Sequence, residues 1–125
     1  DDRGALRDEA SRLAISFQHA QDEAVLTGRT IAWRGSADGY EYLRRGPDRT
    51  WVPIDAEAAF RPRQFPTPVR LTEVEVGGAK LGPGGLVVLS PSAVAPNVRF
   101  LLDANADGLA VEVGSSARVV SRHGS

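Results

Sequence analysis

The sequence predicts an α+β protein in which one long N-terminal helix packs on antiparallel β-sheets of about seven short strands. Two observations predict this class. Residues 6–27 carry the apolar spacing of an amphipathic helix, and residues 29–121 form a β-rich region of short runs separated by Gly- and Pro-containing turns. No second helical pattern lies between those runs to serve as a crossover, so the strands are expected to be antiparallel. A chain of 125 residues fits a single domain over residues 1–125.

The predicted helix has its apolar side chains at spacings of three and four residues, which places them on one face. These side chains are Leu6, Ala10, Leu13, Phe17, Ala20 and Ala24. Neither Gly nor Pro interrupts residues 6–27, and Gly28 is a residue type that commonly ends helices. At ~1.5 Å per residue the helix is roughly 33 Å long, and its apolar face is expected to lie on the sheets.

The β-type runs follow one another closely after the helix. The Asp38-Gly39 pair predicts a tight hairpin turn between the first two runs. An apolar phase slip between Leu71 and Val74 predicts a bulge in a later one. Residues 53–68, which hold four Pro, are expected to form a surface loop. The runs are residues 30–34, 40–44, 50–52, 69–76, 85–89, 98–102 and 109–113, with 118–120 as a further candidate.

The composition argues against several classes of function. Fifteen basic residues against 16 acidic ones leave a net charge of −1, so no global field favours nucleic acid or a membrane surface. The absence of Cys excludes disulfides, Cys-based zinc sites and thiol catalysis. His19 and His123 belong to no catalytic motif, and Ser90-Pro91-Ser92 lacks the frame of a nucleophile elbow. The Glu73 and Glu75 pair is expected to face solvent. We therefore do not expect an enzyme.

One segment resembles the opening of a calcium-binding loop. Asp103, Asn105 and Asp107 alternate before Gly108, as the oxygen ligands of such a loop do. The twelfth position, where a bidentate Glu belongs, is Gly114. The favoured alternative is a hairpin turn, which requires Asp, Asn and Gly for backbone reasons alone. Calcium is the one cofactor that the sequence raises, and we expect none.

A nucleic-acid surface is a further alternative, because arginines suit phosphate contacts and tyrosines and tryptophans offer stacking faces. The arginines concerned are Arg44, Arg45, Arg61, Arg63, Arg118 and Arg122. Acidic residues are interspersed among them, and the aromatic residues fit cross-strand core pairs. A mixed polar surface over an ordinary core is the favoured interpretation.

The chain starts at Asp1-Asp2 and contains no Met, which suggests a piece of a longer protein. No apolar run approaches the ~18 residues that a membrane span needs. Any anchor or targeting signal is therefore expected upstream of Asp1.

Several local motifs, in order along most of the chain, resemble the H-type minor pseudopilins of the bacterial type II secretion system. They are Arg12-Leu13-Ala14, residues 21–29 (QDEAVLTGR), residues 38–43 (DGYEYL), Trp51-Val52-Pro53, Arg61-Pro62-Arg63 and Ser90-Pro91-Ser92. A long helix followed by a small antiparallel sheet is also the pilin-like layout. The sequence departs from the family at Ala93, where relatives often carry Gly, and matches only loosely after Val113.

The resemblance implies a structural subunit anchored in the bacterial inner membrane by a single upstream helix, with this domain in the periplasm. Prepilin peptidase would cleave and N-methylate the missing N-terminus. The subunit would join other minor pseudopilins and the major pseudopilin, at or near the tip of a pseudopilus that drives folded exoproteins through the outer-membrane secretin. The expected partner contacts are Arg7, Asp8 and Arg12 on the helix and Arg61 and Arg63 in the 53–68 loop.

A minor pilin of a type IV pilus with a role in DNA uptake is the second interpretation. Arg118 and Arg122 would then be the DNA contacts. A weak calcium-binding β module is the third.

Overall fold

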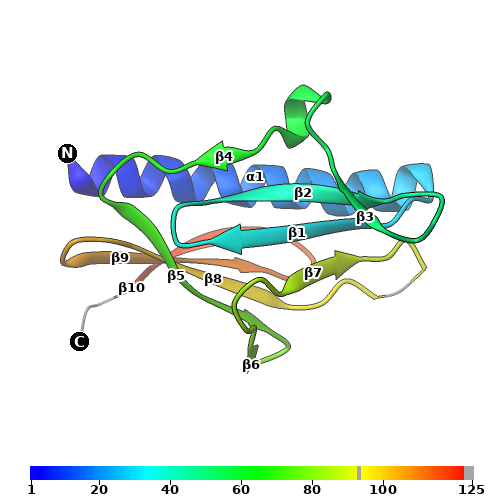
Figure 1. Cartoon of the computed structure of the whole chain (residues 1–125). Helices are drawn as coiled ribbons and strands as arrows, with labels where there is room; N and C mark the ends of the chain where they lie inside the picture. Colours follow the sequence, from blue (N-terminus) through cyan, green and yellow to red (C-terminus); the bar gives the residue numbers. More distant parts are fainter. Residues whose placement is uncertain (93, 123–125) are drawn as a thin grey trace.

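The computed structural model describes residues 1–92 and 94–122, which form one long helix and two antiparallel sheets (Figure 1). The predicted fold class is confirmed. In the described part of the chain, no helix combines the length and the apolarity that crossing a membrane requires.

The helix α1 spans Asp2–Thr27 and begins four residues earlier than predicted. The Asp1 carboxylate accepts a hydrogen bond from the Gly4 N–H at 2.6 Å and caps the first turn, so the residues before Leu6 are helical too. Gly28 ends the helix in the left-handed conformation, with φ 72°. All six residues of the predicted apolar stripe are buried.

The first sheet has the strand order β3-β2-β1-β7, with β4 pairing to the start of β2. The β1–β2 hairpin closes at the pair Ser36 and Gly39, as the Asp38-Gly39 turn predicts. The strands are β1 (Ile31–Ser36), β2 (Gly39–Arg45), β3 (Trp51–Pro53), β4 (Arg63–Gln64) and β7 (Leu86–Leu89).

The second sheet has the strand order β10-β9-β8-β5-β6. Its β5–β8 register shifts between Leu71 and Glu73, which confirms the bulge predicted from the apolar phase slip. The strands are β5 (Val69–Val76), β6 (Ala79–Lys80), β8 (Val98–Ala104), β9 (Asp107–Val113) and β10 (Ala117–Arg122).

Residues 1–92 and 94–122 form ten strands, and the expectation of about seven was too low. The two elements without a counterpart among the predicted runs, β4 and β6, have two residues each and therefore no periodicity to detect. The prediction of a plain surface loop at 53–68 was also wrong. Residues 54–68, called the strap below, contain β4 and the short 3-10 helix η1 (Ala58–Phe60), and they bury Ile54, Phe60 and Phe65.

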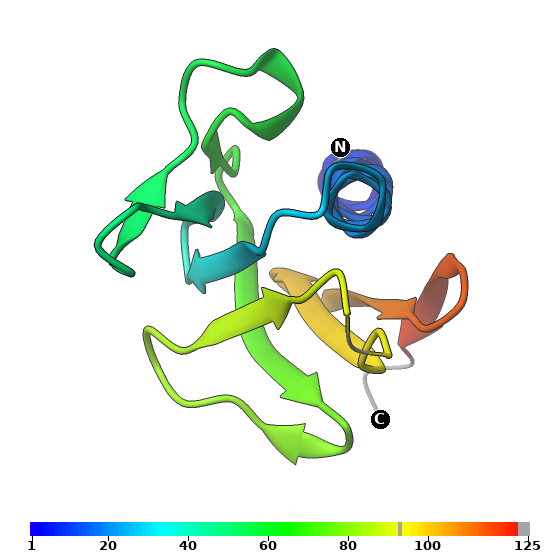
Figure 2. The same ribbon diagram turned by 90° about the vertical axis from the view of Figure 1, so that its right-hand side faces the viewer.

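The helix α1 lies in the angle between the two sheets and packs chiefly on β8, β9 and β10 (Figure 2). An aromatic cluster joins the three units at the centre of the core. The Phe100 ring of β8 lies 5.1 Å from the Phe17 ring of α1 and 4.8 Å from the Trp33 ring of β1, both edge to face. The core is therefore continuous from the helix through both sheets.

Candidate functional site

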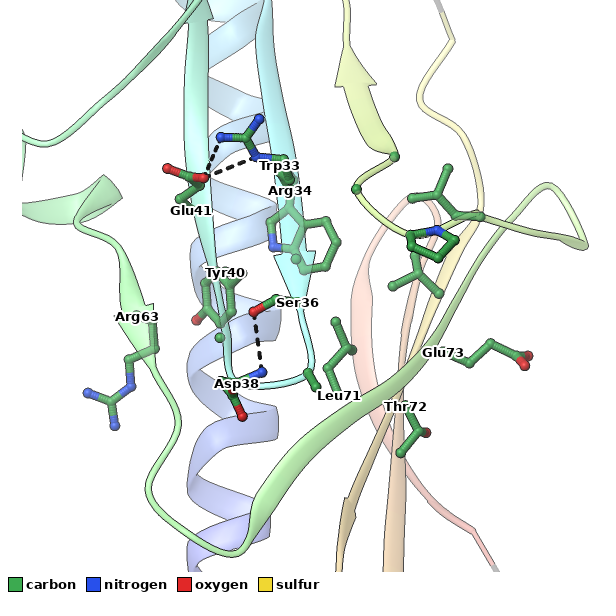
Figure 3. Close-up of a pocket in the computed structure, with 18 of the residues that line it drawn as sticks. Trp33, Arg34, Ser36, Asp38, Tyr40, Glu41, Arg63, Leu71, Thr72 and Glu73 are labelled. Atoms are coloured by element: carbon green, nitrogen blue, oxygen red, sulfur yellow. Dashed lines mark hydrogen bonds and ion pairs between the residues drawn. The ribbon is translucent and has the colours of Figure 1, made fainter.

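A groove of about 880 Å³ lies between the two sheets. One wall is the free end of the β1–β2 hairpin with β4, and the other is β5 with residues 80–85, which lead from β6 to β7 (Figure 3). The lining contains no residue of α1, so the groove opens on a different face from the helix.

Apolar side chains make up the floor of the groove. Trp33, Leu71 and Val74 are buried, and Leu81 is half-buried. Gly35 lets two of them approach, because a Cβ at this position would lie 2.4 Å from the Trp33 ring and 2.8 Å from the Leu71 side chain. A glycine two residues after the tryptophan on one strand thus leaves room for the Trp33 ring and the Leu71 side chain.

The charged side chains at the rim pair with one another. Arg34 donates two hydrogen bonds to Glu41, at 3.0 and 2.6 Å. Lys80 Nζ lies 3.6 Å from a Glu73 carboxylate oxygen. The neighbouring Glu75 carboxyl shares a hydrogen bond with Glu73, which lowers the pKa of Glu73 and raises that of Glu75. The rim therefore offers little net charge to a ligand.

Backbone hydrogen bonds hold the two walls together. The Leu71 N–H of β5 donates to the Ala37 carbonyl at 3.0 Å, and the Phe65 N–H donates to the Asp38 carbonyl at 2.8 Å. On the far wall, the Leu81 N–H donates to the Val74 carbonyl at 2.8 Å. These bonds preorganise the groove, so that binding there costs little ordering entropy.

A buried ion pair lies beside the groove. The Glu9 side chain of α1 is only 3% exposed, and it accepts two hydrogen bonds from Arg63 of β4, one of them at 2.9 Å from Nε to Oε1. The carboxylate raises the pKa of the Arg63 guanidinium. Sequence reasoning had placed Arg63 among the partner contacts and missed Glu9. The available signal was the position of Glu9 within the apolar stripe, where a carboxylate requires a cation.

The other predicted contact residues stay exposed. Arg7 and Asp8 lie on the solvent side of α1, and Arg61 follows η1 on the strap. Arg12 is also exposed and lies 3.9 Å from Glu9. Four of the five predicted side chains are thus exposed to solvent, whereas Arg63 contacts Glu9 of the helix.

The three candidate calcium ligands engage separate partners around the β8–β9 hairpin. Asp103 accepts a hydrogen bond from Arg122 at 2.9 Å, Asn105 donates to Asp2 at 2.7 Å, and Asp107 lies 3.4 Å from Arg3. Asn105 occupies the turn with φ 57°. Within residues 1–92 and 94–122, no group of three or more His, Cys, Asp or Glu side chains could hold a metal ion. The backbone here is that of a hairpin turn, which was the favoured alternative to a calcium-binding loop.

The two candidate DNA contacts are also engaged. Arg118 donates to Glu112 at 3.0 and 2.8 Å, and Arg122 donates to Asp103. A phosphate would have to displace these carboxylates, so the structure adds nothing to the DNA-binding interpretation.

The comparison with protein families decides the assignment. The family described as Type II transport protein GspH matches residues 9–121, which is most of the chain. The chain belongs to the GspH family. The H-type minor pseudopilin resemblance drawn from the sequence is thereby confirmed.

Solved structures agree with the GspH assignment at the level of the fold. One structure of the minor pseudopilin EpsH from the type 2 secretion system of Vibrio cholerae has a TM-score of 0.78 at 14% identity, covering 94% of this chain and 96% of that one. A second EpsH structure has a TM-score of 0.75 at 13% identity, covering 96% of both chains. None of the curated proteins matches significantly. The pilin-like fold is thus shared with little sequence identity.

Proposed function

We propose that this GspH-family protein is a structural subunit of a type II secretion pseudopilus, without catalytic activity or cofactor. The single observation that carries the proposal is the family match over residues 9–121. The proposal includes anchoring in the inner membrane by an upstream helix processed by prepilin peptidase, with this domain in the periplasm. It also places the subunit at or near the tip of the pseudopilus, beside the other minor pseudopilins and the major pseudopilin, where it serves export through the outer-membrane secretin.

The groove between the sheets supplies a docking site for another subunit in this proposal. Its floor is apolar, its rim charges are mutually paired, and its walls are pinned by backbone hydrogen bonds. These properties suit an uncharged, apolar segment of a neighbouring pseudopilin, because such a segment buries its surface without leaving a rim charge unpaired.

The exposed side chains of α1 and the strap supply a second contact in the proposal. Arg7, Asp8 and Arg12 face solvent on the first half of the helix, and Arg61 faces solvent on the strap. The Arg63–Glu9 pair contributes indirectly, because it holds the strap against the helix.

Binding to the globular domains of the other pseudopilins tests the proposal. We expect at least one of them to bind, and we expect Leu81→Asp to weaken that binding by about tenfold or more, because it puts a charge on the apolar floor. Val119→Asp is the matched control, since Val119 is a partly exposed apolar residue on β10, outside the groove. Circular dichroism verifies that both variants fold.

Two results would each count against one part of this proposal. If no pseudopilin domain binds the folded wild-type chain, the subunit role loses its support. If a domain binds but the two variants weaken it equally, the subunit role stands and the groove is not the docking site.

A further inference from the structure

The arginines of this protein fall into two groups by their contacts. Ten basic side chains lie within 4.0 Å of a carboxylate. In the described residues, five arginines have no such partner, and three of the five belong to one hairpin. These five are Arg7, Arg44, Arg45, Arg49 and Arg61.

The arginine hairpin is defined here as residues 44–52, where β2 turns into β3. Arg44 pairs across the ladder with Val52, and Arg45 with Trp51. Arg49 occupies the turn with φ 69°. All three side chains are exposed, and their charges lie within six residues of the chain, with Arg44 and Arg45 on opposite faces of β2.

The one acidic residue of the hairpin is occupied by the turn itself. The Asp48 carboxylate accepts hydrogen bonds from the Thr50 hydroxyl at 2.6 Å and the Thr50 N–H at 3.3 Å. These bonds lower the pKa of Asp48, because they stabilise its ionised form. Asp48 forms no ion pair with the arginines, so the hairpin keeps an excess of positive charge.

A tryptophan orders one of the three arginines. The Arg45 guanidinium carbon lies 4.6 Å from the centroid of the Trp51 ring, and that ring is half-buried. Stacking restricts the guanidinium while leaving its N–H edges available to a planar acceptor. A Trp and Arg pair of this kind is the composition typical of interface hot spots.

The position of the hairpin leaves it accessible. It lies at the end of the molecule where α1 ends, opposite the start of the helix (Figure 1), and it projects away from the helix axis (Figure 2). None of its residues lines the groove, so it is a separate surface from the site described above.

We propose that the arginine hairpin docks an acidic peptide segment of a partner protein. Carboxylates fit the available N–H edges in bidentate geometry, and the three charges complement a short run of Asp or Glu. A nucleic acid is the less favoured occupant. The stacked guanidinium already covers one face of Trp51, and the paired arginines elsewhere extend no basic track for a phosphate backbone.

Titration with a deca-glutamate peptide tests this inference, followed by Trp fluorescence at low and at physiological ionic strength. Trp51 is the reporter, since Trp33 is fully buried. We expect binding that the triple variant Arg44→Gln, Arg45→Gln, Arg49→Gln weakens by about tenfold or more, as the loss of three exposed charge pairs allows. The matched control is Arg3→Gln, Arg70→Gln, Arg118→Gln, which removes three exposed arginines outside the hairpin and should leave binding unchanged.

Three results would overturn the inference. They are no binding of deca-glutamate to the wild-type chain, equal loss in the hairpin and control variants, or tighter hairpin-dependent binding of a ten-base-pair DNA duplex. The test uses no pseudopilin, so its failure is distinguishable from failure of the proposed function.

Discussion

Single side chains decide how the strap meets the helix. Glu9 is buried in α1, and its carboxylate is satisfied by a residue 54 positions away. Ser16 similarly reaches Tyr42, with 2.7 Å between their hydroxyl oxygens. Such polar contacts in a largely apolar interface orient the elements, because each is costly to leave unmade.

The Glu9–Arg63 pair gives a prediction for the free energy of unfolding. Glu9→Ala leaves the Arg63 guanidinium without its partner and is expected to lower that free energy by about 2–3 kcal/mol. The loss is smaller than the roughly 3–5 kcal/mol of a fully buried pair, because the Arg63 side chain is 36% exposed. Urea denaturation measures the change. The double variant Glu9→Met, Arg63→Met should recover part of the loss, and a double variant less stable than Glu9→Ala would contradict this account.

At the scale of elements, the strap behaves as part of the core. The Phe60 ring lies 5.4 Å from the Tyr42 ring of β2 and 5.2 Å from the His19 ring of α1. Ile54 and Phe65 anchor the strap on either side of it. A Pro-rich segment without periodicity is thus ordered by three buried side chains and two ion pairs, Arg63 with Glu9 and Arg29 with Glu57.

Removing the central anchor should loosen the strap. Phe60→Ala is expected to cost about 3–5 kcal/mol, as large-to-small core substitutions do, because Phe60 is 1% exposed. The Phe65 N–H donates to the Asp38 carbonyl and so joins the strap to the β1–β2 turn. Hydrogen exchange of this N–H should accelerate in the variant. Phe60→Leu serves as the conservative comparison. If exchange at Phe65 stays at the wild-type rate in Phe60→Ala, the anchor role is wrong.

At the scale of the whole molecule, stability depends on burying two tyrosines beside α1. Burial raises the pKa of Tyr42 and of Tyr40 above 10, because their ionised forms would lose hydration. The folded state therefore keeps both phenols protonated at pH values where the unfolded chain ionises them.

Alkaline titration checks this effect. The contribution is complete below the unfolded tyrosine pKa of about 10 and is lost as pH rises toward the folded values. There the free energy of unfolding should fall by up to roughly 1.4 kcal/mol per pH unit for each tyrosine. Denaturant titrations between about pH 9 and 11, a range that brackets the tyrosine pKa, measure how steeply the free energy of unfolding falls with pH. Tyr42→Phe should make this fall less steep by the contribution of one tyrosine. An unchanged slope in that variant would show that Tyr42 ionises equally in both states.

Local pattern determined much of this fold. The apolar stripe, the positions of most strands, the Asp38-Gly39 turn and the bulge near Leu71 all followed from periodicity and turn chemistry, which act over a few residues. The ordered motifs likewise identify the family without reference to the fold.

Tertiary structure alone decided the rest. The pairing of β4 with β2, the Glu9–Arg63 contact and the groove between Trp33 and Leu81 join residues far apart in the chain. No local period encodes such contacts, because they form only when both sheets close on the helix. The sequence does not predict which arginines pair with a carboxylate, for the same reason. Composition counts charges, whereas the folded chain alone sets which carboxylate each guanidinium reaches, and it leaves three of them unpaired at the β2–β3 turn.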